Sequence, residues 1–214
     1  KSCGGMTEKF ETCWADTSFP YLTALQDRKE DQKEANLDLS IEAQADKWIR
    51  STPPAFCQAD NQEILAQVLN DYDQETQDFY RWTVRYTAEE LRQIIQQKSG
   101  QDLGDILNLK PLKRGSSGRI YLLEIEGSKK TIRIGKELEI RKWLSPSHLY
   151  SSAFVVDKRV DEQGKILEFI IRGAGWGHGV GLCQIGAACM SQQAYTYQEI
   201  LWHYYPQTEI KKIY

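Results

Sequence analysis

The side chains best suited to chemistry lie in a glycine-rich stretch at residues 172–190. Every second residue from Gly173 to Gly181 is glycine, and Trp176 and His178 lie between these glycines. Glycine has no Cβ, so such a segment can adopt positive φ angles and lets a ligand approach the backbone closely. A strand-like run precedes the stretch and a helical run follows it, which places unpaired N–H groups near His178. The pattern predicts a cradle for an anion or a polar ligand.

Other motifs are excluded in this stretch. The glycine spacing does not fit a dinucleotide fingerprint, and no Lys-Ser or Lys-Thr pair follows as in a phosphate-binding loop. His178 also has no second histidine at metal-ligand spacing, since His148 and His203 are both distant in sequence. Two interpretations stay open: a ligand site, or a tight corner in which His178 only completes hydrogen bonds. The indole of Trp176 in a polar loop favours a sugar-binding face.

The composition is that of an ordinary globular protein. Of the 214 residues, 41% are hydrophobic and 27% are charged, and the formal net charge is −3. This charge gives no attraction to nucleic acid, and no apolar run reaches the roughly 18 residues that a membrane helix requires. The sequence from Lys1 shows no signal segment, and we expect an upstream segment to have been removed.

The rest of the sequence predicts the elements that must position the glycine-rich stretch. Thr87 with Glu90, and Thr196 with Glu199, are capping-box signatures at helix starts. Strands and helices follow no regular βαβ order, so we expect an α+β fold of mostly antiparallel hairpins with peripheral helices. The expected elements are helices near 61–70, 87–97, 136–144, 181–193 and 196–205, a strand at 80–87, a hairpin over 119–135 turning at Gly127-Ser128, a hairpin over 151–175 turning near Gln163-Gly164, and a charged surface insertion at 27–50.

The five cysteines do not form a fully paired disulfide framework, because their number is odd. Cys183 and Cys189 lie in an apolar helical run, and we interpret both as small buried residues. Cys3, Cys13 and Cys57 lie in polar, loop-like surroundings and could meet in space.

The sequence resembles the SpoIID/LytB family of bacterial cell-wall proteins, which includes stage II sporulation protein D and amidase-enhancer types. The resemblance covers residues 1–214 apart from the insertion at 27–50, as a domain that lacks its N-terminal part. It rests on four segments: GAGWGHGVGLCQIGA followed by YQEILWHYYPQTEI, CGGMTE at 3–8 with PYL at 20–22, RGSSGRI at 114–120, and LYSSAF at 149–154.

The resemblance implies an extracytoplasmic protein that acts on peptidoglycan. Sporulation-type members are lytic transglycosylases, in which one glutamic acid serves as general acid and then base and leaves a 1,6-anhydro sugar end. In the family this glutamate lies upstream of the CGG segment, so we expect the general acid upstream of Lys1. The acids within the chain show no spacing that singles out a glycosidase pair and each fits a solvated surface residue: Glu8, Glu11, Asp16, Glu137 and Glu139.

The resemblance also implies a groove for glycan strands, with peptide-free strands preferred. The implied groove residues are Trp176, Gly177, His178, Gly179 and Gln184, with Ser117, Arg119, Ser151, Ser152 and Tyr205 as further contacts. Ser117, Arg119 and the two later serines fit turns and strand ends as well, and Tyr205 also fits a core aromatic.

No cofactor is required for this chemistry, but some family members hold zinc beside the CGG segment. By that resemblance Cys3, Cys13 and Cys57 would be zinc ligands, with the fourth ligand unexplained. A disulfide between two of these cysteines suits an extracytoplasmic protein equally, and free thiols also stay open.

Three functions follow as hypotheses. The chain is the substrate-binding half of a lytic transglycosylase, or a non-catalytic glycan-binding amidase enhancer that stimulates a separate cell-wall amidase, or a structural wall protein. An upstream glutamate of the family type would favour the first, and binding without cleavage would favour the second.

Overall fold

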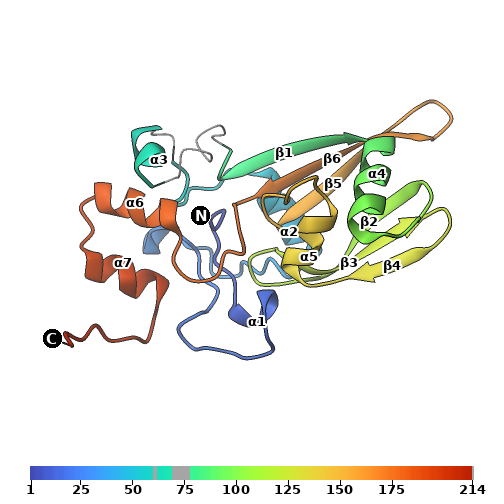
Figure 1. Cartoon of the computed structure of the whole chain (residues 1–214). Helices are drawn as coiled ribbons and strands as arrows, with labels where there is room; N and C mark the ends of the chain where they lie inside the picture. The colour runs from blue at the N-terminus through green and yellow to red at the C-terminus, as the bar shows by residue number, and fades with distance from the viewer. Residues whose placement is uncertain (60–61, 69–77, 214) are drawn as a thin grey trace.

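Two three-stranded antiparallel sheets form one end of the elongated molecule (Figure 1). The computed structural model describes residues 1–59, 62–68 and 78–213. One sheet has the order β1-β6-β5 and the other the order β2-β3-β4. This arrangement confirms the predicted α+β class. The strands are β1 (Arg81–Thr87), β2 (Ile106–Arg114), β3 (Ile120–Gly127), β4 (Thr131–Ile134), β5 (Phe154–Val160) and β6 (Ile166–Ala174).

The largest apolar core joins both sheets to two helices, α4 (Ala88–Ser99) and α5 (Glu137–Trp143). Leu123 of β3, Phe169 of β6 and Ile95 of α4 are all fully buried in it. Burial of this apolar surface is the main term that holds the sheets and helices together. The C-terminal end of β6 and the N-terminal end of β3 lie beside the N-terminal segment. They are at the opposite end of this core from the β5–β6 turn (Figure 1).

The two predicted hairpins are confirmed. β3 pairs with β4 across the turn after Gly127, and β5 pairs with β6 across the turn at Gly164, whose φ is +81°. Both capping boxes are also present. Thr87 Oγ1 accepts from the Glu90 N–H at 3.2 Å, and Thr196 Oγ1 accepts from the Glu199 N–H at 3.3 Å.

Strand β2 was not expected from the sequence. It contains Pro111, which has no N–H to donate, and its pairing with β3 is interrupted by register shifts on either side of Lys113. β2 is an edge strand of its sheet, which is where a sheet tolerates proline.

Residues 27–50 differ from a purely charged surface segment. They include the short helix η1 (Glu30–Gln32) and α2 (Glu42–Arg50), and α2 packs against β5 and β6. Leu39, Ala45 and Trp48 are buried in a core cluster with Val155 of β5. The charged positions of α2 therefore form one face of an amphipathic helix, and the sparse apolar ones anchor it.

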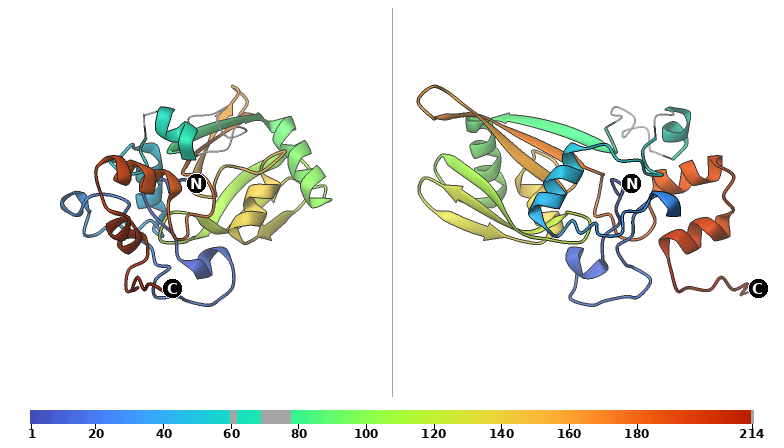
Figure 2. Two further views of the ribbon diagram at one scale, coloured as in Figure 1. Left: turned by 60° about the vertical axis from the view of Figure 1, so that its left-hand side comes forward. Right: turned by 180° about the vertical axis from the view of Figure 1, so that it is seen from behind.

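Three helices lie at the other end of the molecule, around the N-terminal segment (Figure 2): α3 (Gln62–Val68), α6 (Gln184–Gln192) and α7 (Tyr197–Tyr204). α3 lies within the helix expected at 61–70, whose positions 61, 69 and 70 are outside the described residues. α6 begins later than expected, because Gly181 has a φ of +73° and Cys183 is the N-cap. α7 begins one residue after Thr196, as the capping box predicts. In the described ranges, no helix combines the length and apolar character needed to cross a membrane.

Candidate functional site

The glycine-rich loop joins β6 to α6 and is held against the N-terminal segment. The Trp176 N–H donates to the Ser2 carbonyl at 2.8 Å, and the Glu8 N–H donates to the Gly179 carbonyl at 2.9 Å. The four glycines of the loop all have positive φ: Gly175, Gly177, Gly179 and Gly181. The loop can therefore take a path that side-chain-bearing residues rarely adopt, and it leaves the His178 side chain exposed between two of its glycines.

His178 is exposed near the middle of this loop and is a neutral hydrogen-bond donor. Its Nδ1 accepts the Val180 N–H at 3.0 Å, so the proton of the neutral ring is on Nε2. Its ring centroid lies 4.6 Å from that of Trp14. Partial burial of the ring and the nearby charge of Arg119 lower the pKa of His178 to about 4. At neutral pH the imidazole therefore offers an N–H without a charge.

Arg119 supports the loop from inside the protein. It is fully buried, and its Nε donates to the Gly177 carbonyl at 3.1 Å. Its Nη1 donates to the Cys3 carbonyl at 3.3 Å and to Ser117 Oγ at 2.9 Å. A side chain at Gly179 would overlap the guanidinium, so glycine is required there for close packing as well as for its φ of +79°.

Glu8 anchors the other side of Ser117. Its carboxylate is fully buried and accepts from the Ser117 N–H at 3.0 Å and from Ser117 Oγ at 2.6 Å. Its second oxygen accepts from the Lys9 N–H at 2.9 Å and from Thr12 Oγ1 at 3.2 Å. Glu8, Ser117 and Arg119 thus form a buried chain of hydrogen bonds in which a serine bridges the opposite charges.

The sequence-predicted contacts fall into two groups. His178 and Gln184 are exposed, and Gly177, Gly179, Trp176 and Tyr205 are half-buried. By contrast, the side chains of Ser117, Arg119, Ser151 and Ser152 are buried. Arg119 donates to the Gly177 carbonyl and to Ser117 Oγ, so these two side chains support the loop from inside. Ser151 Oγ donates to the Ala174 carbonyl directly before the loop.

Two members of these groups have specific structural roles. Trp176 stacks on Phe79, with ring centroids 4.8 Å apart, and leans on Tyr150 at 4.6 Å. Tyr205 accepts the Leu182 N–H at its hydroxyl, 3.3 Å away. The Trp176 indole is therefore only partly free to meet a ligand.

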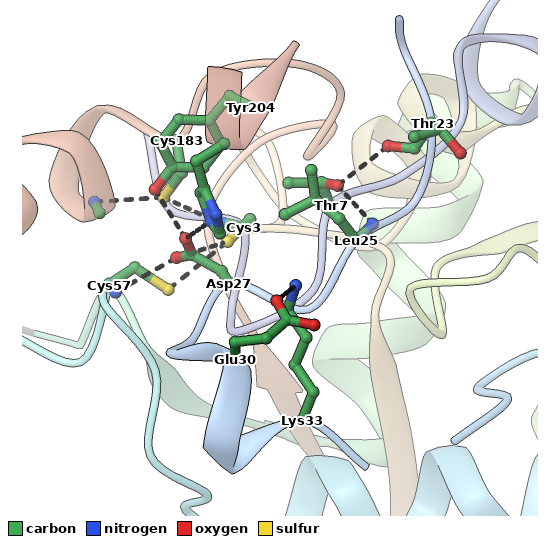
Figure 3. Close-up of polar contacts among 12 residues, drawn as sticks. Cys3, Thr7, Thr23, Leu25, Asp27, Glu30, Lys33, Cys57, Cys183 and Tyr204 are labelled. Carbon is green, nitrogen blue, oxygen red and sulfur yellow. Dashed lines mark hydrogen bonds and ion pairs between the residues drawn. The ribbon is translucent and has the colours of Figure 1, made fainter. Parts of the chain in front are cut away.

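A cluster of three thiols and one carboxylate lies beneath the loop (Figure 3). It consists of Cys3, Asp27, Cys57 and Cys183, all buried, with potential ligand atoms within 4.8 Å of one another. The Cys3 and Cys57 sulfurs are 3.5 Å apart, and Cys3 Sγ lies 3.2 Å from Asp27 Oδ2. Sequence analysis predicted Cys3 and Cys57 here, but it did not predict Asp27 or Cys183.

Cys13 lies outside this cluster. Its Sγ donates to the His178 carbonyl at 3.4 Å and so fastens α1 (Phe10–Cys13) to the glycine-rich loop. Cys183, and not Cys13, supplies the third thiol of the cluster. It is the N-cap of α6, which begins directly after the loop. Cys189 is a buried thiol within that helix. The five cysteines, which all lie within the described ranges, are free thiols.

The electrostatics of the cluster favour a thiolate at Cys183. Burial by itself would raise the pKa of this thiol, but hydrogen bonds from the Cys3 and Cys57 thiols and from the Cys3 N–H lower it well below its usual value. The Cys3 and Gly186 N–H groups lie 3.2 and 3.4 Å from this sulfur. A helix N-terminus stabilises a thiolate in the same sense.

Asp27 is also held in its ionised form. Burial opposes this, but hydrogen bonds from His203, Tyr204 and the neighbouring thiols lower the pKa of Asp27 below its ordinary value. Tyr204 Oη donates to Oδ1 at 2.6 Å, and His203 Nε2 lies 3.3 Å from the same oxygen. These contacts leave Oδ2 facing the sulfurs, as an outer shell orients a metal ligand.

The cluster could hold a metal ion. Three sulfurs and one oxygen make a four-ligand set of the kind that zinc binds, and the sulfurs of a tetrahedral zinc site lie roughly 3.8 Å apart. The observed 3.5 Å between Cys3 and Cys57 is close to that separation. All four ligands come from the protein, so such a site would be closed and structural.

Fold and site together define a class: an α+β domain in which a glycine-rich loop presents a histidine above a buried thiol–carboxylate cluster. The model of a domain of unknown function, DUF8618, matches residues 8–181. The chain therefore belongs to the DUF8618 family.

Two relatives extend the comparison. The amidase enhancer of Bacillus subtilis (strain 168) is 25% identical over 213 residues, which covers 98% of this chain and 28% of that protein. An uncharacterized protein of Brachyspira hyodysenteriae (strain ATCC 49526 / WA1) is 38% identical over 94 residues, or 44% of this chain and 23% of the relative. The chain thus spans about a quarter of the length of the relatives it matches. The first of these agrees with the amidase-enhancer branch of the resemblance found in the sequence.

Proposed function

We propose that this chain binds peptidoglycan glycan strands, as part of an extracytoplasmic cell-wall protein of the amidase-enhancer type. The observation that carries the proposal is the glycine-rich loop, which presents the neutral N–H of the exposed His178 side chain. The similarity to an amidase enhancer over 98% of the chain supports the same class of protein.

The chemistry of the loop suits a polymer that is rich in hydroxyl and amide groups. His178 Nε2–H is a donor, and the exposed amide of Gln184, the first residue of α6, is both donor and acceptor. The buried Arg119 already donates to backbone carbonyls and to Ser117, so its charge serves the loop and not an anionic ligand. Neutral donors and acceptors beside half-buried aromatic rings are typical of sugar recognition.

Four of the five carboxylates considered as general acids are paired with other groups, and the fifth, Glu11, lines a cleft beside Asp16. Glu8 is buried and fully hydrogen-bonded, and Glu137 is buried beside Arg141 at 3.5 Å. Asp16 and Glu139 are paired with lysines, at 3.0 and 2.8 Å. This favours binding over cleavage for these four residues, and a lytic transglycosylase function would need its acid from Glu11 or from a segment preceding Lys1.

The proposed metal role is structural. Cys3, Asp27, Cys57 and Cys183 would hold a zinc ion that joins the N-terminal segment to the start of α6. When bound, the ion would neutralise the charge that the thiolate and Asp27 concentrate below the loop. The side chains themselves fix the geometry: Asp27 is oriented by Tyr204, and Cys183 caps α6.

The test is to mix the purified chain with peptide-free glycan strands, measure binding by calorimetry and identify the products by mass spectrometry. We expect binding without new 1,6-anhydro ends. His178→Ala and Gln184→Ala should each weaken binding by about tenfold, the loss typical of a central polar contact. Gln163→Ala, at the β5–β6 turn on the far end of the molecule, is the matched control and should bind normally.

Two outcomes would contradict the proposal. Strands that do not bind the wild-type chain would rule out the glycan site itself. New 1,6-anhydro ends would place the general acid within these residues and favour the transglycosylase. A second assay adds a purified cell-wall amidase, and the amidase-enhancer assignment predicts faster release of stem peptides in the presence of the wild-type chain than of His178→Ala.

A further inference from the structure

Four aromatic residues form a row that begins beside His178 and includes residues of α1 and of the segment that follows it. This aromatic row consists of Phe10, Trp14, Phe19 and Tyr21. The Trp14 and Phe10 ring centroids are 5.0 Å apart, Phe10 and Phe19 are 4.9 Å apart, and Phe19 and Tyr21 are 5.8 Å apart. Trp14 meets His178 at 4.6 Å, so the row begins at the candidate site.

The exposure of the row is not explained by packing. Trp14 is 43% exposed and Tyr21 is 37% exposed, although large aromatic side chains contribute most to folding when they are buried. Phe10 and Phe19 are half-buried and support the two exposed rings from below. The row therefore leaves the Trp14 and Tyr21 side chains partly accessible to solvent, next to two half-buried rings.

The backbone beneath Trp14 is fixed. The Trp14 N–H donates to the Phe10 carbonyl at 3.1 Å, and the Trp14 carbonyl accepts from Lys136 Nζ, which also binds Asp16 at 3.0 Å. Cys13 Sγ fastens the same turn to the His178 carbonyl. A ring held in this way loses little conformational freedom when a ligand binds, so it contributes more of its contact energy to affinity.

The far end of the row returns to the glycine-rich loop. A Cβ placed on Gly181 would lie 3.6 Å from Leu22, the residue after Tyr21, and 3.3 Å from the Tyr205 hydroxyl. Leu22, which follows the row, and Tyr205 thus both pack against the loop at Gly181.

The flanks of the row are polar. Residues 15–18, between Trp14 and Phe19, are small or polar and exposed. Asp16 and Ser18 also line a cleft of about 460 Å³, with Glu11 and Ser116 among its other residues. A single row of rings with polar flanks suits a chain of sugar rings, whose C–H faces stack while their edges form hydrogen bonds. A protein partner would favour a broader apolar patch.

We propose that Trp14 and Tyr21 form an aromatic subsite that stacks on successive sugar rings of the glycan strand and extends its binding beyond His178. This inference rests on the proposed function and assigns the second part of the same surface. It commits to an oligosaccharide with repeating ring faces. Affinity should therefore increase with strand length, and the increase should depend on the row.

The experiment measures, by calorimetry, the binding of a glycan disaccharide and of longer peptide-free strands to the wild-type chain and to variants. Trp14→Ala and Tyr21→Ala should weaken the binding of long strands by about tenfold, as expected for truncation of an aromatic anchor, and leave disaccharide binding unchanged. His178→Ala should weaken both. Trp202→Ala is the matched control, because Trp202 is 51% exposed on α7 and lies outside the row.

The outcomes separate this inference from the proposed function. If the wild-type chain binds long strands and Trp14→Ala and Tyr21→Ala bind them equally well, the aromatic subsite is wrong and the glycan function stands. If these variants bind glycan normally but no longer stimulate the amidase, the row is a protein interface and the subsite is again wrong. If the wild-type chain binds no glycan of any length, both fail. Thermal unfolding of each variant checks that the exposed substitutions leave the fold intact.

Discussion

Gly179 and Gly164 have nearly the same backbone conformation, with φ of +79° and +81°, but different surroundings. A Cβ on Gly164 meets nothing within 4 Å, whereas one on Gly179 overlaps the buried guanidinium of Arg119. We expect Gly164→Ala to lower the free energy of unfolding by about 1–2 kcal/mol, from left-handed strain alone. Gly179→Ala should cost more, because Arg119 must also move away from its acceptors.

The comparison is made by urea denaturation together with the glycan-binding assay. Gly164→Ala should bind glycan normally, and Gly179→Ala should not, because the loop that carries His178 is displaced. Equal losses of stability in the two variants would mean that Arg119 does not pack under the loop as described.

The protonation of His178 gives a second prediction for a single residue. Its pKa is lowered from the ordinary 6.5 to about 4, by partial burial and by Arg119. The unfolded chain then binds a proton at higher pH than the folded chain does, so this residue makes the fold less stable as pH falls from about 6.5 to 4. Above pH 5 the ring is neutral, and glycan affinity should not change with its titration.

The measurement is an NMR titration of the His178 ring protons alongside glycan binding at several pH values. A midpoint near 4, with constant affinity between pH 5.5 and 7.5, is the expected result. A midpoint near 6.5 would show that neither burial nor the charge of Arg119 disfavours protonation of the ring as described. His148, which is also exposed, serves as the reference histidine in the same spectra.

The two capping boxes allow a test of helices in different settings. α4 packs on the sheets, whereas α7 carries His203 and Tyr204, which orient Asp27. Thr87→Ala and Thr196→Ala should each lower the free energy of unfolding by about 1 kcal/mol, the usual effect of losing an N-cap. Only Thr196→Ala should also weaken metal retention, measured by competition with a chelator. Equal metal retention in the two variants would show that α7 does not hold Asp27 in position.

Much of the element order could be predicted because it depends on local signals. The hairpins around Gly127 and Gly164 and the capped helices α4 and α7 follow from turn glycines and from Thr-Glu spacing, which act within a few residues. Strand β2 lacks such a signal, because Pro111 argues against a strand and is tolerated only at a sheet edge. Nothing local in residues 27–50 shows that Leu39 and Trp48 are buried by β5.

The candidate site also has parts with a local sequence signal and parts without one. The glycine-rich loop is visible in the sequence, and so are Cys3 and Cys57 as potential ligands. Cys183 was interpreted as an apolar helix residue, because its place beside Cys3 depends on how the loop returns to the N-terminal segment. Asp27 is oriented by His203 and Tyr204, and Trp14 contacts His178, each more than 150 residues away. No local pattern predicts such contacts.

At the scale of the whole molecule, the thiol–carboxylate cluster connects four segments that share no sheet: the N-terminal segment, residues 27 and 57, and the start of α6. We expect the purified chain to contain one zinc ion, measured by elemental analysis. Removal by a chelator should lower the melting temperature. A ligand present at a thousand times its dissociation constant raises the free energy of unfolding by about 4 kcal/mol. For a chain of this size that corresponds to a melting temperature higher by roughly 10 °C.

The cysteines outside the cluster provide matched controls for this prediction. Cys57→Ser and Cys183→Ser should lose the metal and the melting-temperature difference. Cys13→Ser and Cys189→Ser should keep both, because their sulfurs lie elsewhere. Metal content that is unchanged in Cys183→Ser, or lost in Cys13→Ser, would contradict the assignment.

Cys3 and Cys183 are separated by 180 positions in the sequence, yet the Cys3 N–H contacts the Cys183 sulfur. During synthesis the first ligand therefore emerges long before the last, and the pocket that joins them cannot close until nearly the whole chain has left the ribosome. Closing so long a loop is entropically costly and slow compared with forming the local hairpins. The β2-β3-β4 sheet can form early, whereas the β1-β6-β5 sheet and the N-terminal segment wait for β6 and α6. The order of events in time thus runs from the sheet end of the molecule to the loop that carries His178.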